Sequence, residues 1–413
     1  MGISDKVTLP RVLYFSDVPI EATMFQGAGL VYRLLEDYPP DRLLAIETKQ
    51  TSATAEKRLP GVAYRKFAMS GNRWRYTRLS HYVGSWMLLG ASRHARRLRG
   101  ALGGFSPDAV LTLTFGYSWL VAARFAEFEK LPLHLISHDD WLPTMHVLRG
   151  LRSRQDDAFR TAYQYASSRL CVSPFMEEEY RRMYGVPGQV LYPSWGKDVP
   201  PLPNKPRAYG NHAEPLVGAY AGNIFRPGYT QLIVSLAERL EARGGRLLLF
   251  GPYSTKELNS CGLQRNSVRA LGVAGPTEML SRIRAEADFA FVPMSFESGS
   301  LERNMRISFP SKLTDCTVAG LPLLIWGPEY CSAVRWAQRY APVAEVVTSL
   351  AKEDVDTALC RLEQPQHRER LGKAAREVGD RLFSNRVAKQ TFYKALMGGS
   401  KIEQNECAYD KAR

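Results

Sequence analysis

The 413-residue sequence contains little cysteine. Its six cysteines stand at positions 171, 261, 316, 331, 360 and 407, without a CxxC pair. This spacing predicts neither a zinc site nor a disulfide framework, and it is typical of the reduced thiols of a cytoplasmic protein. The histidines show no HxxH or HExxH spacing, so we expect no bound metal and no metal cofactor. No run of eighteen apolar residues is present and the first ten residues lack an apolar core, so we expect neither a membrane span nor secretion.

Acidic residues are missing from Lys57 to Pro107, a stretch that holds eleven lysines or arginines. It accounts for most of the net charge of +14 and predicts an anionic partner. Within it, five apolar residues are predicted to share one helical face. These are Leu79, Tyr82, Val83, Trp86 and Met87.

The basic block has three alternative interpretations. The first is an interfacial helix that docks on anionic lipid, the second is a nucleic-acid-binding surface, and the third is a core helix of the first domain with solvated arginines. We favour the membrane interpretation, on the inner face of the membrane, and expect no nucleic acid because no recognised nucleic-acid module is present. The residues predicted for a membrane or acceptor surface are Arg73, Arg75, Arg78, Trp86, Arg96 and Arg97.

Short β-branched apolar runs alternate with helical stretches along the whole chain, which predicts an α/β protein with parallel sheets covered on both faces. Helices are expected at 29–36, 117–129 and 229–243. We predict an N-terminal domain at 1–195, a Pro- and Gly-rich linker at 196–215 and a second α/β domain at 216–384. A final helix is expected at 385–397 and a disordered tail at 398–413.

The stretch SFPSKLTD at 308–315 places proline, serine, lysine and an acid just before a small-residue helix that ends in Gly320-Leu321-Pro322. A helix that begins near Pro310 or Ser311 offers free N–H groups and a positive dipole end to an anion. Lys312 adds a point charge for phosphate, and Asp315 could accept bonds from ribose hydroxyls. The plain alternative is an ordinary loop, helix and strand with a solvated lysine, and the local chemistry leaves the two even.

This segment resembles the nucleotide-sugar signature of the large retaining glycosyltransferase family with the GT-B fold, in the family 4-like, bacterial sugar-transfer type. In that family an acid stands five residues before the Gly of Gly-x-Pro, as Asp315 does before Gly320. The family's other glutamate lies eight residues earlier, where this chain has Ile307, and Glu297 or Glu302 from the preceding loop are its candidate substitutes. The resemblance implies two Rossmann-like domains whose parallel sheets face a cleft.

Three further loops fit the resemblance. The turn at 218–228 contains Gly222, Asn223 and Arg226, and of these only Arg226 can replace the family's basic pair at the diphosphate; the GxGxxG dinucleotide fingerprint is absent. Gly27 and Gly29 form the glycine loop of the first domain, which is equally well a plain turn. His138 follows a predicted strand where members of the family carry a histidine beside the transferred sugar; its alternative is a surface histidine beside a helix cap.

Together these features predict a hexosyltransferase that moves a sugar from a nucleoside diphosphate sugar to a sugar or lipid-linked acceptor, in polysaccharide or glycolipid synthesis. Retention of configuration is implied by the resemblance alone. The predicted catalytic residues are His138, Lys312 and Arg226, and the predicted donor-binding residues are Gly222, Asn223, Arg226, Ser308, Phe309, Pro310, Ser311, Lys312 and Asp315. The alternatives are a nucleotide-sugar epimerase of related fold, a non-catalytic nucleotide-sugar or lipid-binding protein, and a basic nucleic-acid binder.

Overall fold

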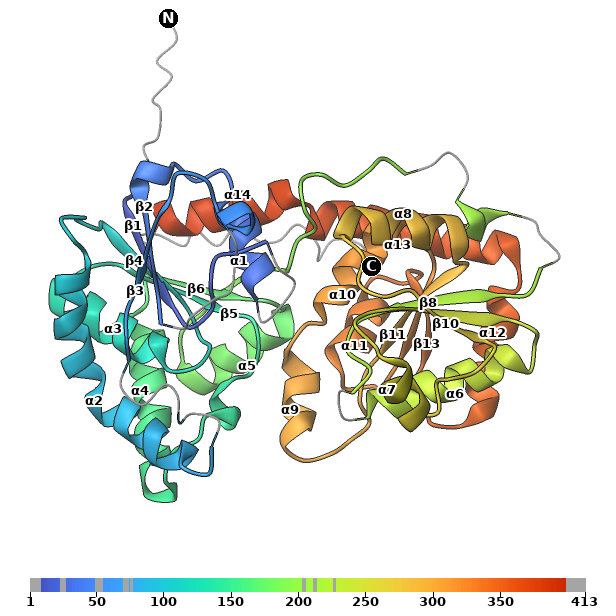
Figure 1. Ribbon diagram of the computed structural model, residues 1–413, viewed down its shortest axis with the longest axis horizontal. Coiled ribbons are helices and arrows are strands. Elements are labelled where there is room, and N and C mark those ends of the chain that lie inside the picture. The colour runs from blue at the N-terminus through green and yellow to red at the C-terminus, as the bar shows by residue number, and fades with distance from the viewer. Residues whose placement is uncertain are drawn as a thin grey trace, which may run out of the picture. The chain divides into compact units, whose positions relative to one another are not determined.

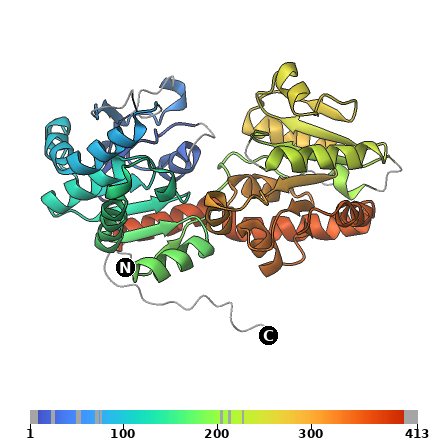
Figure 2. The same cartoon turned by 90° about the horizontal axis from the view of Figure 1, so that it is seen from below.

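The computed structural model describes residues 9–22, 27–48, 55–69, 74, 77–202, 206–210, 214–225 and 228–398. The chain divides into two compact units, Met1–Leu191 with Lys389–Arg413 as unit 1 and Tyr192–Ala388 as unit 2. Each unit is built on one parallel sheet with helices on both of its faces (Figure 1, Figure 2). The predicted α/β fold with two parallel sheets is confirmed.

The sheet of unit 1 has the strand order β3-β2-β1-β4-β5-β6-β7. Four of its strands are buried along their whole length, which explains their continuous apolar sequences. The strands are β1 (Val12–Ser16), β2 (Leu43–Glu47), β3 (Ala63–Lys66), β4 (Ala109–Leu113), β5 (Leu133–Ser137), β6 (Ser168–Cys171) and β7 (Gln189–Val190). The helices are α1 (Ala28–Leu35), α2 (Ser80–Ala101), α3 (Ser118–Glu129), α4 (Arg152–Tyr165) and α5 (Pro174–Tyr184), with 3-10 turns at Pro40–Arg42, Ala55–Lys57, Leu142–Thr144 and Arg149–Leu151.

The sheet of unit 2 repeats the scheme with the order β10-β9-β8-β11-β12-β13. Its strands are β8 (Val217–Ala221), β9 (Arg246–Phe250), β10 (Val268–Ala270), β11 (Phe289–Pro293), β12 (Leu323–Trp326) and β13 (Ala344–Val347). Its helices are α6 (Tyr229–Glu241), α7 (Thr255–Ser260), α8 (Pro276–Glu286), α9 (Ser300–Ile307), α10 (Ser311–Ala319), α11 (Ser332–Arg339), α12 (Lys352–Leu362) and α13 (Pro365–Phe383), with a 3-10 turn at Arg207–Tyr209.

Each sheet has one point where the order of its strands reverses. In unit 1 the first strand β1 pairs with β2 on one side and with β4 on the other. In unit 2 the first strand β8 pairs with β9 and with β11 in the same way. Parallel sheets of this kind bind ligands beyond the carboxyl ends of the strands at such a reversal. The loops that follow β8 and β11, and those that follow β1 and β4, are therefore the first places to look for a site.

The last helix, α14 (Asn385–Met397), is fastened to the start of unit 1 by charge and by an aromatic contact. Lys389 Nζ lies 2.9 Å from Glu36 Oε1 and also bonds the carboxylate of Asp37. The rings of Tyr38 and Tyr393 meet edge to face with their centroids 5.9 Å apart. Lys389 and both of its acids are in unit 1, so the C-terminal end of the chain is part of the N-terminal unit.

Two expectations about local structure are wrong. The long loop predicted between β11 and α10 contains the helix α9, so Ile307 and Glu302 lie on a helix rather than in that loop. The five apolar residues predicted for one face of α2 are divided: Met87 is 2% exposed, whereas Tyr82 and Trp86 are 62% and 64% exposed. The predicted tail lies outside the described residues from position 399 on. No helix of the described chain is both long enough and apolar enough to cross a membrane.

Candidate functional site

The strongest constellation lies in unit 2, where the turn after β8 meets the start of α10. Gly222 has a φ of 144°, a conformation that side chains rarely allow, and a Cβ placed on it would lie 1.7 Å from Lys312 Nζ. The lysine ammonium therefore occupies the space that any other residue at position 222 would fill. This position lies beyond the carboxyl ends of the strands, next to β8 and β11, where the strand order of the sheet reverses.

Lys312 is held in this place by two tyrosines. Its Nζ donates a hydrogen bond of 2.8 Å to the hydroxyl of Tyr220, the second-last residue of strand β8. The same Nζ lies 4.6 Å from the centre of the Tyr220 ring and 6.0 Å from that of Tyr229, which attracts the cation to the ring faces. The cation is half-buried in the first turn of α10, where the positive end of the helix dipole opposes it. An anion at this place would relieve that repulsion.

Two helix N-termini are brought to the same edge. Helix α6 begins after Gly228 and helix α10 after Pro310; neither has a side-chain cap or an acid in its first turn. Gly228 has a φ of 74°, and a Cβ there would lie 2.2 Å from the hydroxyl oxygen of Ser295, which follows β11. The N–H groups at the start of such helices bind phosphate well. Lys312, the turn at Gly222 and the starts of α6 and α10 are together called the anion edge below.

The other predicted residues of the SFPSKLTD stretch differ in their environment. Ser311 is exposed and Asp315 is half-buried one turn beyond Lys312, both on α10. Phe309 is only 5% exposed and its ring packs against Tyr192 and Phe383 with centroids 5.0 and 5.6 Å away. Ser308 is buried as well, and its carbonyl accepts a bond from the Ser332 hydroxyl. Phe309 is thus a core side chain, and a donor could meet Ser308 and Phe309 only through their backbone.

The place of the family's first glutamate is closed to a ligand. Ile307 is 1% exposed at the end of α9. Of the two substitutes, Glu302 is ion-paired with Arg306 at 2.7 Å on that helix, and Glu297 is exposed in the preceding loop. Asn223 is exposed beside Gly222, and its side-chain oxygen accepts a bond from Phe225 N. Arg226 lies outside the described residues.

In unit 1 the predicted glycine loop and histidine meet. Gly27 precedes α1 with a φ of 85°, and a Cβ there would lie 3.1 to 3.3 Å from three atoms of the His138 ring. The His138 side chain is 9% exposed, and neither ring nitrogen has a hydrogen-bond partner among the described residues. Burial lowers the pKa of His138, although the Asp139 carboxylate opposes this. A neutral imidazole is therefore placed against the start of a helix, while Gly29 lies within the first turn of that helix.

Asp17, which was not predicted from the sequence, follows β1 at the point where the strand order of unit 1 reverses, and it joins the ends of neighbouring elements there. Its carboxylate accepts bonds from Tyr117 N at 2.7 Å and Ser118 N at 3.3 Å, at the start of α3. It also accepts a bond from the hydroxyl of Thr48, which follows β2. Because Asp17 is 1% exposed, these bonds make it a structural bracket rather than a ligand group.

The loop after His138 is fastened to α2. The Tyr117 hydroxyl donates to His146 O at 2.9 Å and accepts from His146 N at 3.1 Å. On α2, Ser85 Oγ accepts from Leu148 N at 2.9 Å. A Cβ on Gly84 would lie 1.8 Å from His146 O, so the loop approaches the helix at a position where α2 lacks a side chain.

The opposite face of α2 carries large apolar side chains in contact with solvent. Leu79, Tyr82, Trp86 and Leu89 are 46%, 62%, 64% and 54% exposed, at the spacing of one helical stripe. We call these four residues the α2 stripe. Arg78, Arg93, Arg96 and Arg97 are exposed along the same region. Leu89 was not among the five apolar residues predicted for this face, whereas Arg73 and Arg75 lie outside the described residues.

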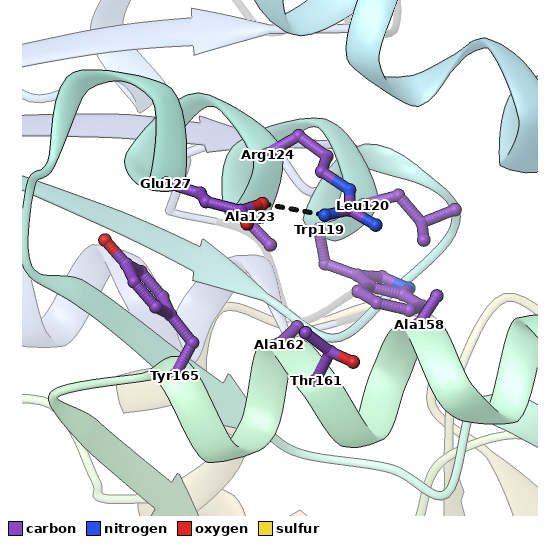
Figure 3. A pocket seen from close by; sticks show the side chains of 9 residues that line it. All are labelled: Trp119, Leu120, Ala123, Arg124, Glu127, Ala158, Thr161, Ala162 and Tyr165. Atoms are coloured by element: carbon purple, nitrogen blue, oxygen red, sulfur yellow. Dashed lines mark hydrogen bonds and ion pairs between the residues drawn. The ribbon is translucent and has the colours of Figure 1, made fainter.

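A small depression between α3 and α4 is no candidate for a nucleotide. Figure 3 shows its lining, which runs from Trp119 to Tyr165, with the pair Arg124 and Glu127 at its edge. It encloses about 40 Å³. That is room for a water molecule at the buried indole N–H of Trp119 and little more.

Comparisons with known proteins agree with this fold. A family model described as a glycosyl transferase 4-like domain matches residues 31–193. HepE of Anabaena, solved with UDP and glucose, superposes with a TM-score of 0.64 at 13% identity, over 94% of this chain and 99% of that one. The chain has the GT-B fold. No curated protein sequence matches it.

Two further structures share the GT-B fold with this chain. An α,α-trehalose 6-phosphate synthase of Burkholderia multivorans gives a TM-score of 0.61 at 13% identity, with coverage of 93% of this chain and 97% of that one. MurG of Acinetobacter baumannii gives 0.52 at 12% identity, with coverage of 94% and 99%. The resemblance predicted from the SFPSKLTD stretch is thereby confirmed, at the level of the fold for the chain and at the level of the family model for residues 31–193.

Two residues that contact the anion edge, Tyr220 and Ser295, were not predicted from the sequence. Tyr220 stands in VGAYAG, where it is the only polar side chain of a strand otherwise made of small and apolar residues. That contrast was a usable signal. Ser295 follows β11 with no distinguishing pattern, and only the folded chain brings it to Gly228.

Proposed function

We propose that this protein is a glycosyltransferase that binds a nucleoside diphosphate sugar at the anion edge of unit 2. The observation that carries the proposal is the ammonium of Lys312, fixed over Gly222 between two uncapped helix starts. The fold supports it, because HepE of the same fold was solved with UDP and glucose. UDP is therefore the first nucleotide to test.

In the proposed reaction the bond between sugar C1 and the diphosphate oxygen breaks, and its electron pair leaves with the diphosphate. The acceptor hydroxyl oxygen bonds to C1, and its proton passes to an oxygen of the leaving diphosphate. Negative charge grows on the leaving group, where Lys312 and the N–H groups of α6 and α10 are preorganised to stabilise it. We assign Arg226 to the same task, and Asp315 to the ribose hydroxyls.

Unit 1 is proposed to serve the sugar and the acceptor. A neutral imidazole has one donor and one acceptor nitrogen, so His138 can bond sugar hydroxyls at the Gly27 loop. We propose a hexose as the transferred sugar, retention of its configuration, and a saccharide or lipid-linked acceptor of polysaccharide or glycolipid synthesis. NMR of the product formed in EDTA tests both retention and independence from divalent metal.

The first experiment is a thermal-shift panel of UDP, GDP, ADP and their sugars on the wild type and on a Lys312→Ala, Asp315→Ala double variant. A ligand that binds the folded state stabilises it by about 2.7 kcal/mol at a concentration a hundredfold above its Kd, and this stabilisation raises Tm. We expect one diphosphate to stabilise the wild type and not the double variant. If no nucleotide shifts the wild type, the anion edge is not a donor site.

Epimerase and binding-only alternatives are separated by turnover. An epimerase would convert the nucleotide sugar without an acceptor, whereas a binding protein would show the thermal shift and no product. A nucleic-acid binder would show steeply salt-dependent DNA or RNA affinity and no response to nucleotides.

We further propose that the α2 stripe docks on the anionic inner face of a membrane. Four exposed apolar side chains beside exposed arginines suit a lipid surface, where the former enter the headgroup region and the latter bind the anionic lipids. The proposal implies a cytoplasmic protein that is peripheral to the membrane.

The membrane proposal predicts co-sedimentation with vesicles that contain phosphatidylglycerol, weakened by salt, and much less with pure phosphatidylcholine. A Tyr82→Ser, Trp86→Ser variant is expected to bind at least ~10-fold more weakly, given ~1.5–3 kcal/mol for each large apolar side chain buried. Leu350→Ser is the matched control, because Leu350 is 53% exposed in unit 2. Equal loss in the control would refute a specific role for α2.

A further inference from the structure

The hydroxyl of Tyr220 links two parts of the anion edge. It accepts a hydrogen bond from Lys312 Nζ at 2.8 Å and donates one to Asn223 O, also at 2.8 Å. A phenol has one donor and can accept as well, and an ammonium can only donate, so this pattern has a single direction. The Tyr220 side chain is 1% exposed, and its ring lies under the same ammonium.

We propose that Tyr220 is a positioning residue, which holds the Lys312 ammonium and the turn at Gly222 in the arrangement that receives the nucleoside diphosphate. This inference rests on the proposed function. A lysine side chain carries about 2 kcal/mol of rotamer entropy, which binding must otherwise remove. With the ammonium already fixed by Tyr220, that cost is met in the free protein and does not weaken the ligand's affinity. An ammonium has three N–H groups, so its bond to Tyr220 is compatible with bonds to phosphate oxygens.

The second hydrogen bond of the Tyr220 hydroxyl, to Asn223 O, connects Lys312 to the residues that follow β8. Asn223 is tied twice, through its carbonyl to Tyr220 and through its side chain to Phe225 N at 2.8 Å. Residues 223–225, which follow the turn at Gly222, are therefore fixed relative to Lys312, which belongs to α10. One hydroxyl thus sets the spacing between two of the elements expected to contact the diphosphate.

The test replaces Tyr220 by phenylalanine in the full chain, which keeps the ring and removes only the hydroxyl. Kd for UDP, and for GDP and ADP in parallel, is measured by calorimetry together with kcat and KM for the donor. We expect Kd and donor KM to rise about tenfold, the size of one lost hydrogen bond to a charged group, with a smaller change in kcat. A purely structural tyrosine would lower Tm and leave the affinity of the folded protein unchanged.

A double-mutant cycle with Lys312→Met makes the test specific. Tyr220→Phe should weaken binding about tenfold in the wild type, but less than about twofold once Lys312 is methionine, because the ammonium that the hydroxyl positions is then already absent. Tyr209→Phe is the matched control: its hydroxyl donates to Gly320 O at 2.6 Å, at the C-terminal end of α10 rather than at the start of the helix, where Lys312 lies. We expect it to change Tm and not Kd.

The outcomes separate the two proposals. If Lys312→Met abolishes nucleotide binding while Tyr220→Phe binds like the wild type, or if the loss is the same in both backgrounds, Tyr220 does not position Lys312 and the proposed function stands. If the wild type binds no nucleoside diphosphate, the positioning role falls together with the function it serves.

Discussion

A Lys312→Met variant is expected to lose about 10²–10³ in kcat/KM for the donor, the usual cost of removing one preorganised group that stabilises developing charge. Methionine keeps most of the length of the side chain and its packing on the Tyr220 ring, while it removes the charge. The measurement is steady-state transfer from the nucleotide sugar that the thermal-shift panel identifies.

The stability of this variant should move differently from its activity. A cation in the first turn of α10 is opposed by the helix dipole, so its removal relieves about 0.3–1 kcal/mol and offsets part of the lost bond to Tyr220. We therefore expect a Tm close to that of the wild type. Lys373→Met removes the same charge from an exposed position of α13 and should leave activity unchanged. A Lys312→Met enzyme with full activity would contradict the assignment of this lysine to the leaving group.

A Gly222→Ala variant should raise the donor KM at least ~10-fold, because a methyl group at this position and the Lys312 ammonium cannot share the same space. The ammonium is the end of a flexible side chain, so it can move aside, and the protein is expected to fold. It then leaves the Tyr220 hydroxyl, and the cation is lost from the anion edge without any change to Lys312 itself.

Backbone strain is the competing explanation, and a second glycine isolates it. Gly262 also has a positive φ, of 76°, but a Cβ on it would meet nothing within 4 Å. Gly262→Ala should therefore cost about 1 kcal/mol or somewhat more of stability, from the left-handed backbone alone, and leave KM unchanged. If both variants raise KM alike, strain and not the displacement of Lys312 is the cause.

The fold was predictable because its strands are buried on both faces. Segments such as AVLTL and LLLF are almost entirely apolar, and a parallel sheet between helices is the arrangement that uses such strands repeatedly. The helix α9 was missed because SLERNMRI carries one polar face and only a few apolar residues, so it resembles a loop when its packing is unknown. Ile307 is the informative residue there, since its burial at the helix end depends on contacts that no local pattern reveals.

The candidate site was predictable in part, for a physical reason that differs from residue to residue. Lys312 and Gly222 stand out locally, as a cation at a helix start and a glycine after a strand, and the fold brings them together. Phe309 was assigned to the donor by its place in SFPSKLTD, but an aromatic side chain among Tyr192, Trp336 and Phe383 belongs to the core. Tyr220 differs from its neighbours within its strand, but its role depends on Lys312, a partner 92 residues away.

The attachment of the His138 loop to α2 has a consequence for how unit 1 can respond to its surroundings. One face of the helix holds the loop at Gly84 and Ser85, while the other exposes Tyr82 and Trp86. A shift or tilt of the helix is expected to move the backbone of His146 and Leu148 as well, because His146 O packs closely on Gly84 and Leu148 N donates a hydrogen bond to Ser85. A force applied to the exposed face of α2 would therefore also displace the segment that begins at His138, because the helix is in contact with that segment on its other side.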